Sequence, residues 1–252
     1  MNYKSILNKI MSADMKKAGF SFSALGTNAF CFENENGTRQ VLIDTERFGP
    51  RELRFAYQAT GKHYFRFYLK YLDPAFCPVA KQTYETKEEL VFYLESVTRD
   101  TTRIILPYLD VMEDNYVEYE ESLSQQMSLN LQERISRFQK TWDFSLQYEA
   151  TQLKKLDAIM DSMRSTISAR KEDFYRHKEE FLDLSACYGE LLNMESHTPG
   201  NWVRKESKPG HFEYVVGPTQ YNPLWRAMFA WNFGPEVAQY SLQGYHLKVE
   251  VT

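Results

Sequence analysis

Glycine and proline are missing from the middle of this chain. Between Tyr108 and Tyr188, 81 consecutive residues contain neither of them. Because glycine and proline punctuate turns and interrupt helices, such a run argues against a loop-rich or all-β middle third. We therefore expect the middle third to be helical, with long helices laid against each other.

Cysteine is scarce. The three cysteines, Cys31, Cys77 and Cys187, are odd in number and widely spaced, and no C-x-x-C pair occurs. Disulfide scaffolds and zinc sites use paired cysteines at short spacings. The sequence thus gives no disulfide framework, and we expect reduced, mostly buried thiols.

Long hydrophobic runs are absent as well. No stretch approaches the roughly 20 apolar residues that a membrane-spanning helix needs. The N-terminus is amphipathic and rich in lysine, and it lacks the apolar core and cleavage site of a signal peptide. We expect a soluble, cytoplasmic protein with no membrane partner.

Charge is nearly balanced overall but unevenly placed. The 252 residues carry a net charge of −4, and 15% of them are aromatic, which excludes a disordered chain. Residues 1–112 have a net charge of +2, residues 113–193 of −6, and residues 194–252 of zero. Bulk charge therefore gives no reason to expect non-specific binding to nucleic acid.

The first 110 residues predict an α+β domain with an antiparallel sheet and two flanking helices. An Asn-Gly pair at 36–37 favours a hairpin, and Thr86 with Glu89 forms a capping-box pattern. Pro107 should end or kink the second helix. The predicted elements are a helix over 3–18, strands over 28–34, 39–46, 51–59 and 63–70, and a helix that begins near residue 86.

Residues 111–193 predict a long, coiled-coil-like helical hairpin. Apolar residues recur at steps of three and four, which favours arms over 130–165 and 168–192, joined by a turn at residues 165–168. Asn130 followed by Glu133 resembles an N-cap. The first arm would be about 50 Å long at 1.5 Å per residue. The acidic stretch 110–121 is interpreted as either a helix or a tether.

Residues 194–252 predict a small, aromatic-rich subdomain that contains β-structure and packs on the rest of the chain. Strands over 201–206 and 211–216 flank a Pro-Gly turn, and a helix over 223–231 should start at Pro223. Residues 246–251 alternate as a final strand. With only about 55 residues, this part should pack on the helices or extend the first sheet. The whole chain is thus expected to be α+β.

The sequence contains no motif that indicates a particular enzymatic reaction. No P-loop, G-x-G-x-x-G, H-E-x-x-H or G-x-S-x-G motif occurs. His177 shares a possible helix face with Asp173 and Glu180, and the opposite arm offers Asp157 and Asp161. We interpret this group as a solvated salt-bridge face rather than a metal site. We expect no catalytic residue, no metal and no cofactor. The sequence does not decide whether the protein is an enzyme, but it favours a protein without catalytic activity.

The outer face of the predicted sheet offers a candidate binding surface. Arginine and tyrosine side chains should project there from adjacent strands, where they can bind carboxylates, phosphates or bases. Alternatively, this is the polar face that any such sheet must have, or a face that the acidic stretch 110–121 covers. The residues of this predicted surface are Arg54, Tyr64, Arg66, Tyr68 and Lys70.

The aromatic C-terminal part offers a second candidate surface. Clustered tryptophans are typical interface anchors, and an adjacent arginine adds a cation–π contact. The simpler interpretation is that these large side chains form the core of a small subdomain. The residues predicted to bind a partner here are Trp202, Trp225, Arg226 and Trp231.

Three motifs follow one another in the first 110 residues: K-A-G-F at 17–20, F-R-F at 65–67 and I-L-P-Y-L at 105–109. In this order the region resembles a bacterial family of small α+β domains known as domain of unknown function 4304. The resemblance covers under half of the chain, and no functional residue comes with it. Such families often accompany toxin-immunity or defence genes, so the resemblance implies a partner-binding role.

Together these patterns favour a non-enzymatic interaction protein, an accessory or immunity-type subunit of a bacterial system that binds another protein. The first alternative is a nucleic-acid-binding protein that uses the basic and aromatic sheet face. The second is a hydrolase with a scattered site that no local motif reveals. Self-association through exposed positions of the apolar stripe is a further expectation.

Overall fold

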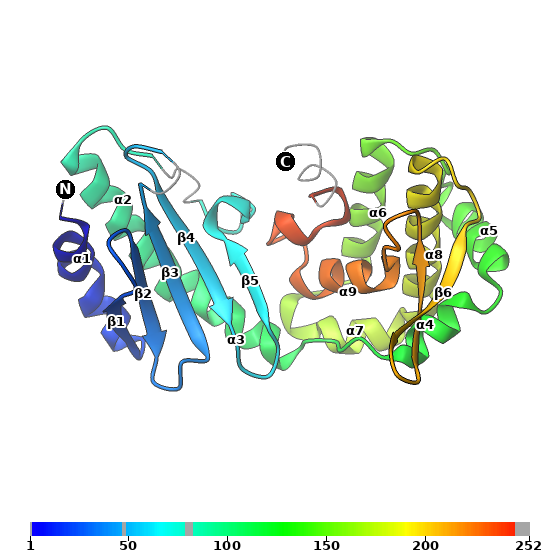
Figure 1. Ribbon diagram of the computed structural model, residues 1–252, viewed down its shortest axis with the longest axis horizontal. Helices are drawn as coiled ribbons and strands as arrows, with labels where there is room; N and C mark the ends of the chain where they lie inside the picture. Colours follow the sequence, from blue (N-terminus) through cyan, green and yellow to red (C-terminus); the bar gives the residue numbers. More distant parts are fainter. Residues whose placement is uncertain (1, 47–48, 79–82, 245–252) are drawn as a thin grey trace. The chain divides into compact units, whose positions relative to one another are not determined.

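The chain forms two compact units, Met1–Glu113 and Asp114–Thr252. The structure, a computed structural model, describes residues 2–46, 49–78 and 83–244 (Figure 1). Both units combine helices with antiparallel strands, so the predicted α+β class is confirmed. Within the described ranges, no helix combines the length and the apolar character that crossing a bilayer requires.

The first unit is an antiparallel meander with helices before and after it. Its five strands pair in sequence order, β1-β2-β3-β4-β5, and Gly37 takes a φ of 65° in the predicted Asn-Gly turn. Strand β1 is a further strand that the sequence did not predict. The elements are α1 (Tyr3–Lys17), β1 (Phe20–Ala24), β2 (Ala29–Asn34), β3 (Arg39–Thr45), β4 (Leu53–Ala59), β5 (Phe65–Tyr68), a 3-10 turn (Leu69–Tyr71), α2 (Lys87–Asp100), a π-helical turn (Thr101–Ile105) and α3 (Leu106–Asp114).

Side chains cap both flanking helices at their N-termini. The Asn2 side chain accepts a hydrogen bond from the backbone N–H of Ser5 at 3.1 Å. The Thr86 hydroxyl accepts from the N–H of Glu89 at 3.1 Å, and the Glu89 carboxylate accepts from the N–H of Glu85 at 2.7 Å. The predicted capping pattern is confirmed, with the reciprocal bond made one residue earlier than in a standard capping box.

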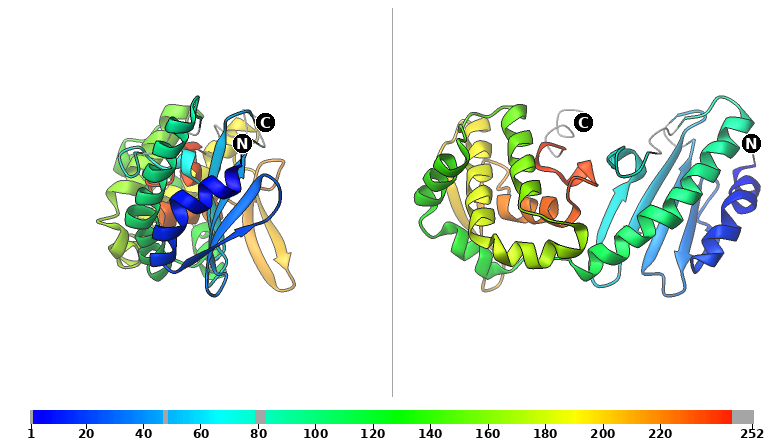
Figure 2. Two further views of the ribbon diagram at one scale, coloured as in Figure 1. Left: turned by 90° about the vertical axis from the view of Figure 1, so that its left-hand side faces the viewer. Right: turned by 180° about the vertical axis from the view of Figure 1, so that it is seen from behind.

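Alternation along the strands decides which sheet face becomes the core. Phe55 packs edge-on against Tyr93 of α2, and the Tyr57 hydroxyl lies 2.7 Å from the Thr101 hydroxyl. Helices α2 and α3 therefore cross this face, as the rear view in Figure 2 shows, and α1 packs beside α2 and β1. Successive residues of a strand point to opposite faces, so Arg54 and Gln58 belong to the other side.

Pro107 does not end the second helix, but a π-helical turn comes shortly before it. The π-helical turn Thr101–Ile105 precedes the proline, and the N–H of Leu106 bonds to the carbonyl of Thr101, five residues back. Proline lacks an N–H and its ring crowds the preceding turn, and the wider π turn accommodates both effects. The chain then continues as α3 to Asp114, so the first half of the acidic stretch is helical.

The second unit is a helical assembly with one β-hairpin. A single helix, α8, forms its centre, because thirteen successive residues from Phe181 to Asn193 are buried. A helix buried all round must be surrounded by other elements, and α4, α5, α6, α9 and β7 pack against it. The elements are α4 (Glu121–Ser128), α5 (Leu131–Trp142), α6 (Ala150–Ser162), a 3-10 turn (Ile167–Ala169), α7 (Arg170–Arg176), α8 (Lys178–Glu195), β6 (Trp202–Lys208), β7 (His211–Val216), α9 (Pro223–Phe233) and a 3-10 turn (Ala238–Tyr240).

The predicted two-armed hairpin is wrong. The expected arm over 130–165 is two helices, because the chain leaves α5 at Asp143, which has a left-handed φ of 46°. Phe144 then turns inward against Phe138, with ring centroids 5.3 Å apart. The second arm breaks at His177, between α7 and α8. Asn130 also takes a left-handed conformation, and its side chain makes no cap hydrogen bond.

The C-terminal part completes the core of the second unit. The hairpin β6–β7 turns at Pro209-Gly210, and α9 begins at Pro223, both as predicted. The two strands form their own sheet and do not extend the first one. Residues of α9 and α8 share one hydrophobic cluster. The predicted strand over 246–251 lies outside the described residues.

Candidate functional site

The open face of the first unit's sheet carries three of the five predicted binding residues. Strand register places Tyr68 opposite Ala56 and Arg66 opposite Gln58, and Arg54 lies on the same face of β4. This face is turned to the viewer in Figure 1, and no described helix of the first unit crosses it. Tyr64 precedes β5 and is 68% exposed.

Lys70 departs from the alternation that predicted it. It lies in the 3-10 turn after β5, where side chains no longer alternate between two faces, and its ammonium stands 4.6 Å from the ring centroid of Tyr71. The structure therefore gathers Arg54, Arg66 and Tyr68 on the sheet face and leaves Lys70 beyond its end.

Carboxylates and amides alternate with the arginines on this open face. A row of amides crosses three strands: Gln58 donates to Gln40 at 3.2 Å, and Gln40 donates to the Glu33 carboxylate at 3.3 Å. Arg54 donates through Nε to Glu52 at 2.6 Å. The guanidinium of Arg66 lies 5.3 Å from the centroid of the Tyr68 ring. The face is thus mixed in charge and rich in hydrogen-bonding groups.

Trp231, one of the predicted partner-binding residues, is fully buried, so that prediction is wrong for this residue. Its exposed fraction is 0%, and its indole N–H donates to the carbonyl of Arg170 at 3.1 Å. Phe174 and Phe181 meet the indole edge-on, each with a centroid distance of 5.6 Å. The interpretation of the aromatic tail as core material holds here.

Arg226 is also interior, with 7% of its surface exposed, and its prediction as a surface residue is wrong. Its guanidinium donates to the carbonyls of Gln239 at 2.9 Å and Ser241 at 2.7 Å. It lies over the ring of Tyr240, 5.9 Å from the centroid, and so holds the segment after α9 in place.

Trp202 anchors the hairpin to α8. Its indole N–H donates to the carboxylate of Glu190 at 3.0 Å, and its ring lies directly over Gly189. The half-buried indole therefore has a structural role at the base of β6, which differs from the predicted role in binding a partner.

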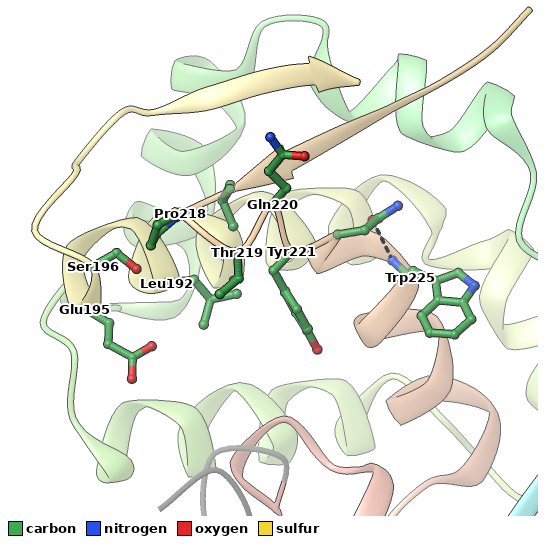
Figure 3. A pocket seen from close by; sticks show the side chains of 11 residues that line it. Leu192, Glu195, Ser196, Pro218, Thr219, Gln220, Tyr221 and Trp225 are labelled. Atoms are coloured by element: carbon green, nitrogen blue, oxygen red, sulfur yellow. Dashed lines mark hydrogen bonds between the residues drawn. The ribbon is translucent and has the colours of Figure 1, made fainter. Parts of the chain in front are cut away.

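Trp225 is the one predicted tryptophan that stands at the surface, with 52% of its area exposed. It lies in the first turn of α9, where the Asn222 side chain accepts from its backbone N–H at 3.0 Å. Two hollows, of about 520 and 880 Å³, adjoin Trp225 and Asn222. Figure 3 shows the smaller one, where Leu192 and Glu195 at the end of α8 lie on one side, Trp225 lies on the other side, and Tyr221 stands between them.

We call these two hollows together the Trp225 groove. The larger hollow is lined by aromatic and charged side chains: Tyr119, Phe212, Trp225, Glu120, Glu121, Glu213, Lys208 and His211. Glu121 receives the N–H of Phe212 at 2.9 Å and lies 2.9 Å from Nδ1 of His211. These bonds, the one from the backbone foremost, lower the pKa of the Glu121 carboxyl and keep it ionised.

The cysteine thiols lie in the interior of the protein. Burial raises the pKa of the Cys31 thiol to about 12 and raises that of Cys187 still further, so neither is activated as a nucleophile. All three cysteines are buried thiols, as predicted.

The charged group around His177 differs from the predicted solvated face. Asp173 is buried, accepts from the N–H of Ser165 at 2.6 Å and pairs with Arg176 at 3.0 Å. Asp157 accepts the backbone N–H groups of Leu242 and Gln243 at 2.8 and 2.9 Å. Among the residues that the structure describes, no three histidine, cysteine or carboxylate side chains are grouped to hold a metal ion.

Comparison of the chain with family models, curated proteins and solved structures gives no match. The resemblance of the first 110 residues to a bacterial α+β family therefore stays a prediction.

Sequence reasoning found Trp225 but missed the groove around it. The one local signal was Asn222-Pro223, which marks a helix start and fixes residue 225 in the first turn. The larger hollow is also lined by Tyr119 and Glu121, which lie a hundred residues earlier, and no sequence period connects them to Trp225.

Proposed function

We propose that this protein is a non-catalytic interaction subunit that binds another protein through the open face of its five-stranded sheet. The observation that carries the proposal is that Arg54, Arg66 and Tyr68 share this face, which no described helix of the first unit crosses. Arginine and tyrosine are enriched in protein interfaces because they combine large contact area with hydrogen bonding. An accessory or immunity-type role in a bacterial cytoplasm rests on the family resemblance and the sequence alone.

The charge pattern supports a protein partner over a nucleic acid. A phosphate backbone is bound by a field of one sign, from clustered lysines and arginines. Here Glu33 and Glu52 lie among the arginines, and Asp44 stands opposite Arg54 in the register of β3 and β4. Alternating charges suit a partner with alternating charges of its own, which also fixes register and specificity.

Charge reversal on the open face tests the proposal. The tagged protein is recovered from the cells that express it, as wild type, as Arg54→Glu with Arg66→Glu, and as Lys4→Glu with Lys16→Glu. Both lysines of the control pair are exposed on α1, so the control makes the same change in charge elsewhere on the first unit. We expect a co-purified protein that is lost from the arginine variant and retained by the lysine variant.

Thermal unfolding of both variants checks that the sheet is intact. Equal recovery of the partner with both variants would show that the open face is not the interface. A co-purified nucleic acid, released by salt and lost with the two arginines, would replace the proposal by the nucleic-acid alternative.

A further inference from the structure

The Trp225 groove lies in the second unit and takes no part in the function proposed above. We propose that it binds an extended segment of a partner protein and that an arginine or lysine side chain of this segment stacks on Trp225. The argument rests on the fixed aromatic surface, the excess of carboxylates and the shape of the groove.

Trp225 is held in a defined orientation although half of it faces solvent. The Asn222 side chain fixes its backbone, and the ring of Phe229, one turn later in α9, meets the indole edge-on with centroids 4.5 Å apart. An ordered indole face costs a ligand little conformational entropy. Tryptophan is also the best aromatic partner for a cation, because its ring face carries the strongest negative potential.

Carboxylates outnumber cations around the larger hollow. Glu120, Glu121 and Glu213 line it together with Lys208 and His211. Part of this charge holds the protein together: Glu121 binds the β7 backbone, and Glu213 accepts from the Asn222 amide at 2.5 Å. The remaining negative potential favours a guanidinium or ammonium group and repels a phosphate.

The shape of the groove favours a linear segment over a single small cation. Hollows of about 520 and 880 Å³ share Asn222 and Trp225, so an occupant that crosses Trp225 has room for side chains on both sides. Each volume alone lies in the range of a small-molecule site. A sugar would also stack on the indole, but it would leave the carboxylate excess without a counter-charge.

Synthetic peptides test this inference without knowledge of the partner. The probes are three fluorescein-labelled octapeptides that alternate serine with arginine, lysine or glutamate, measured by fluorescence anisotropy with the full chain. We expect the arginine and lysine peptides to bind and to weaken as salt is added. The glutamate peptide should not bind.

Variants of the groove residues then test whether the peptide binds in the Trp225 groove. Trp225→Ala should weaken binding of the arginine peptide about tenfold, an effect between those of an exposed and a desolvated cation–π contact. Glu120→Gln and Glu213→Gln should each weaken it about threefold, as expected for a partly exposed ion pair. Tyr175→Ala is the matched control, because Tyr175 is another exposed aromatic residue of the second unit, and it should leave the affinity unchanged.

Several results would overturn the inference. One is equal affinity of wild type and Trp225→Ala for the arginine peptide, and another is equal binding of the glutamate peptide. Displacement of the arginine peptide by a neutral oligosaccharide would assign the groove to sugars instead. Absence of binding by all three peptides at millimolar concentration would also refute it.

Discussion

Gly189 lies in the middle of α8, where an added methyl group would collide with Trp202. A Cβ at this position would stand 2.2 Å from the Cη2 atom of the Trp202 indole and 2.9 Å from Cγ of Pro223. Neither neighbour can yield easily, because the indole is hydrogen-bonded to Glu190 and the proline ring is rigid. We predict that Gly189→Ala destabilises the second unit.

The expected change in the free energy of unfolding combines one stabilising and two destabilising effects. Replacing glycine by alanine inside a helix stabilises it by about 1 kcal/mol. Displacing the indole loses a hydrogen bond to a charged group, which contributes about 1.5–3 kcal/mol, and overpacking costs about 1–3 kcal/mol. The clash outweighs the helix preference, and we expect a net loss of about 2–4 kcal/mol in the free energy of unfolding.

Urea unfolding followed by tryptophan fluorescence measures this loss in the right part of the chain. All four tryptophans lie in the second unit, so the signal reports on that unit. The control is Gly26→Ala in the first unit, where a Cβ would meet no atom within 4 Å, and its unfolding is followed by circular dichroism because no tryptophan lies in that unit. It should change the stability by less than about 0.5 kcal/mol.

A double-mutant cycle decides whether the indole is the cause. In a Trp202→Ala background, Gly189→Ala should cost at least about 1 kcal/mol less than in the wild type, since only Pro223 still obstructs the new methyl group. If Gly189→Ala stabilises the wild type by the helix preference alone, or costs the same in both backgrounds, the packing argument is refuted.

Three further predictions follow from burial. Trp231→Ala should lower the stability by about 3–5 kcal/mol, whereas Trp225→Ala should change it by less than about 1 kcal/mol, in the same urea assay; similar losses would contradict the assigned burial. Burial raises the pKa of Asp157 above its ordinary value of 3.8, so its ionisation opposes folding. Wild type should therefore lose stability relative to Asp157→Asn as the pH rises above that value, and a gain would contradict the sign. All three thiols should resist Ellman's reagent in the native protein and react after urea is added; fast native labelling would show that one is accessible.

Local signals decided the elements of the first unit. The spacing of apolar residues in α1, the Asn-Gly turn and the strict alternation in β4 and β5 each act over a few residues, so the sequence predicts them directly. The strand β1 was missed because F-S-F-S-A is short and begins directly after Gly19, the glycine with a φ of 86° that follows α1. Its pairing with β2 comes from the tertiary structure.

The helical middle shows the limit of such signals. A stripe at steps of three and four fits one long helix or two short ones equally well. Helix α5 ends just before Asp143, which takes a left-handed conformation. Aspartate adopts this conformation only occasionally, and no glycine or proline in the sequence marks the position. After α5 the chain changes direction, and Phe144 becomes buried against Phe138 of α5.

The sequence by itself determined the α+β class, the strands β2 to β5, the helix cap at Thr86, the hairpin at Pro209-Gly210 and the start of α9, because neighbouring residues carry that information. Only the tertiary structure decided which aromatic residues are core and which are surface. Trp225 and Trp231 lie on one helix and look alike in sequence, but one faces solvent beside two hollows and the other is enclosed by Phe174 and Phe181. Exposure depends on neighbours that are distant along the chain, so composition and spacing cannot supply it.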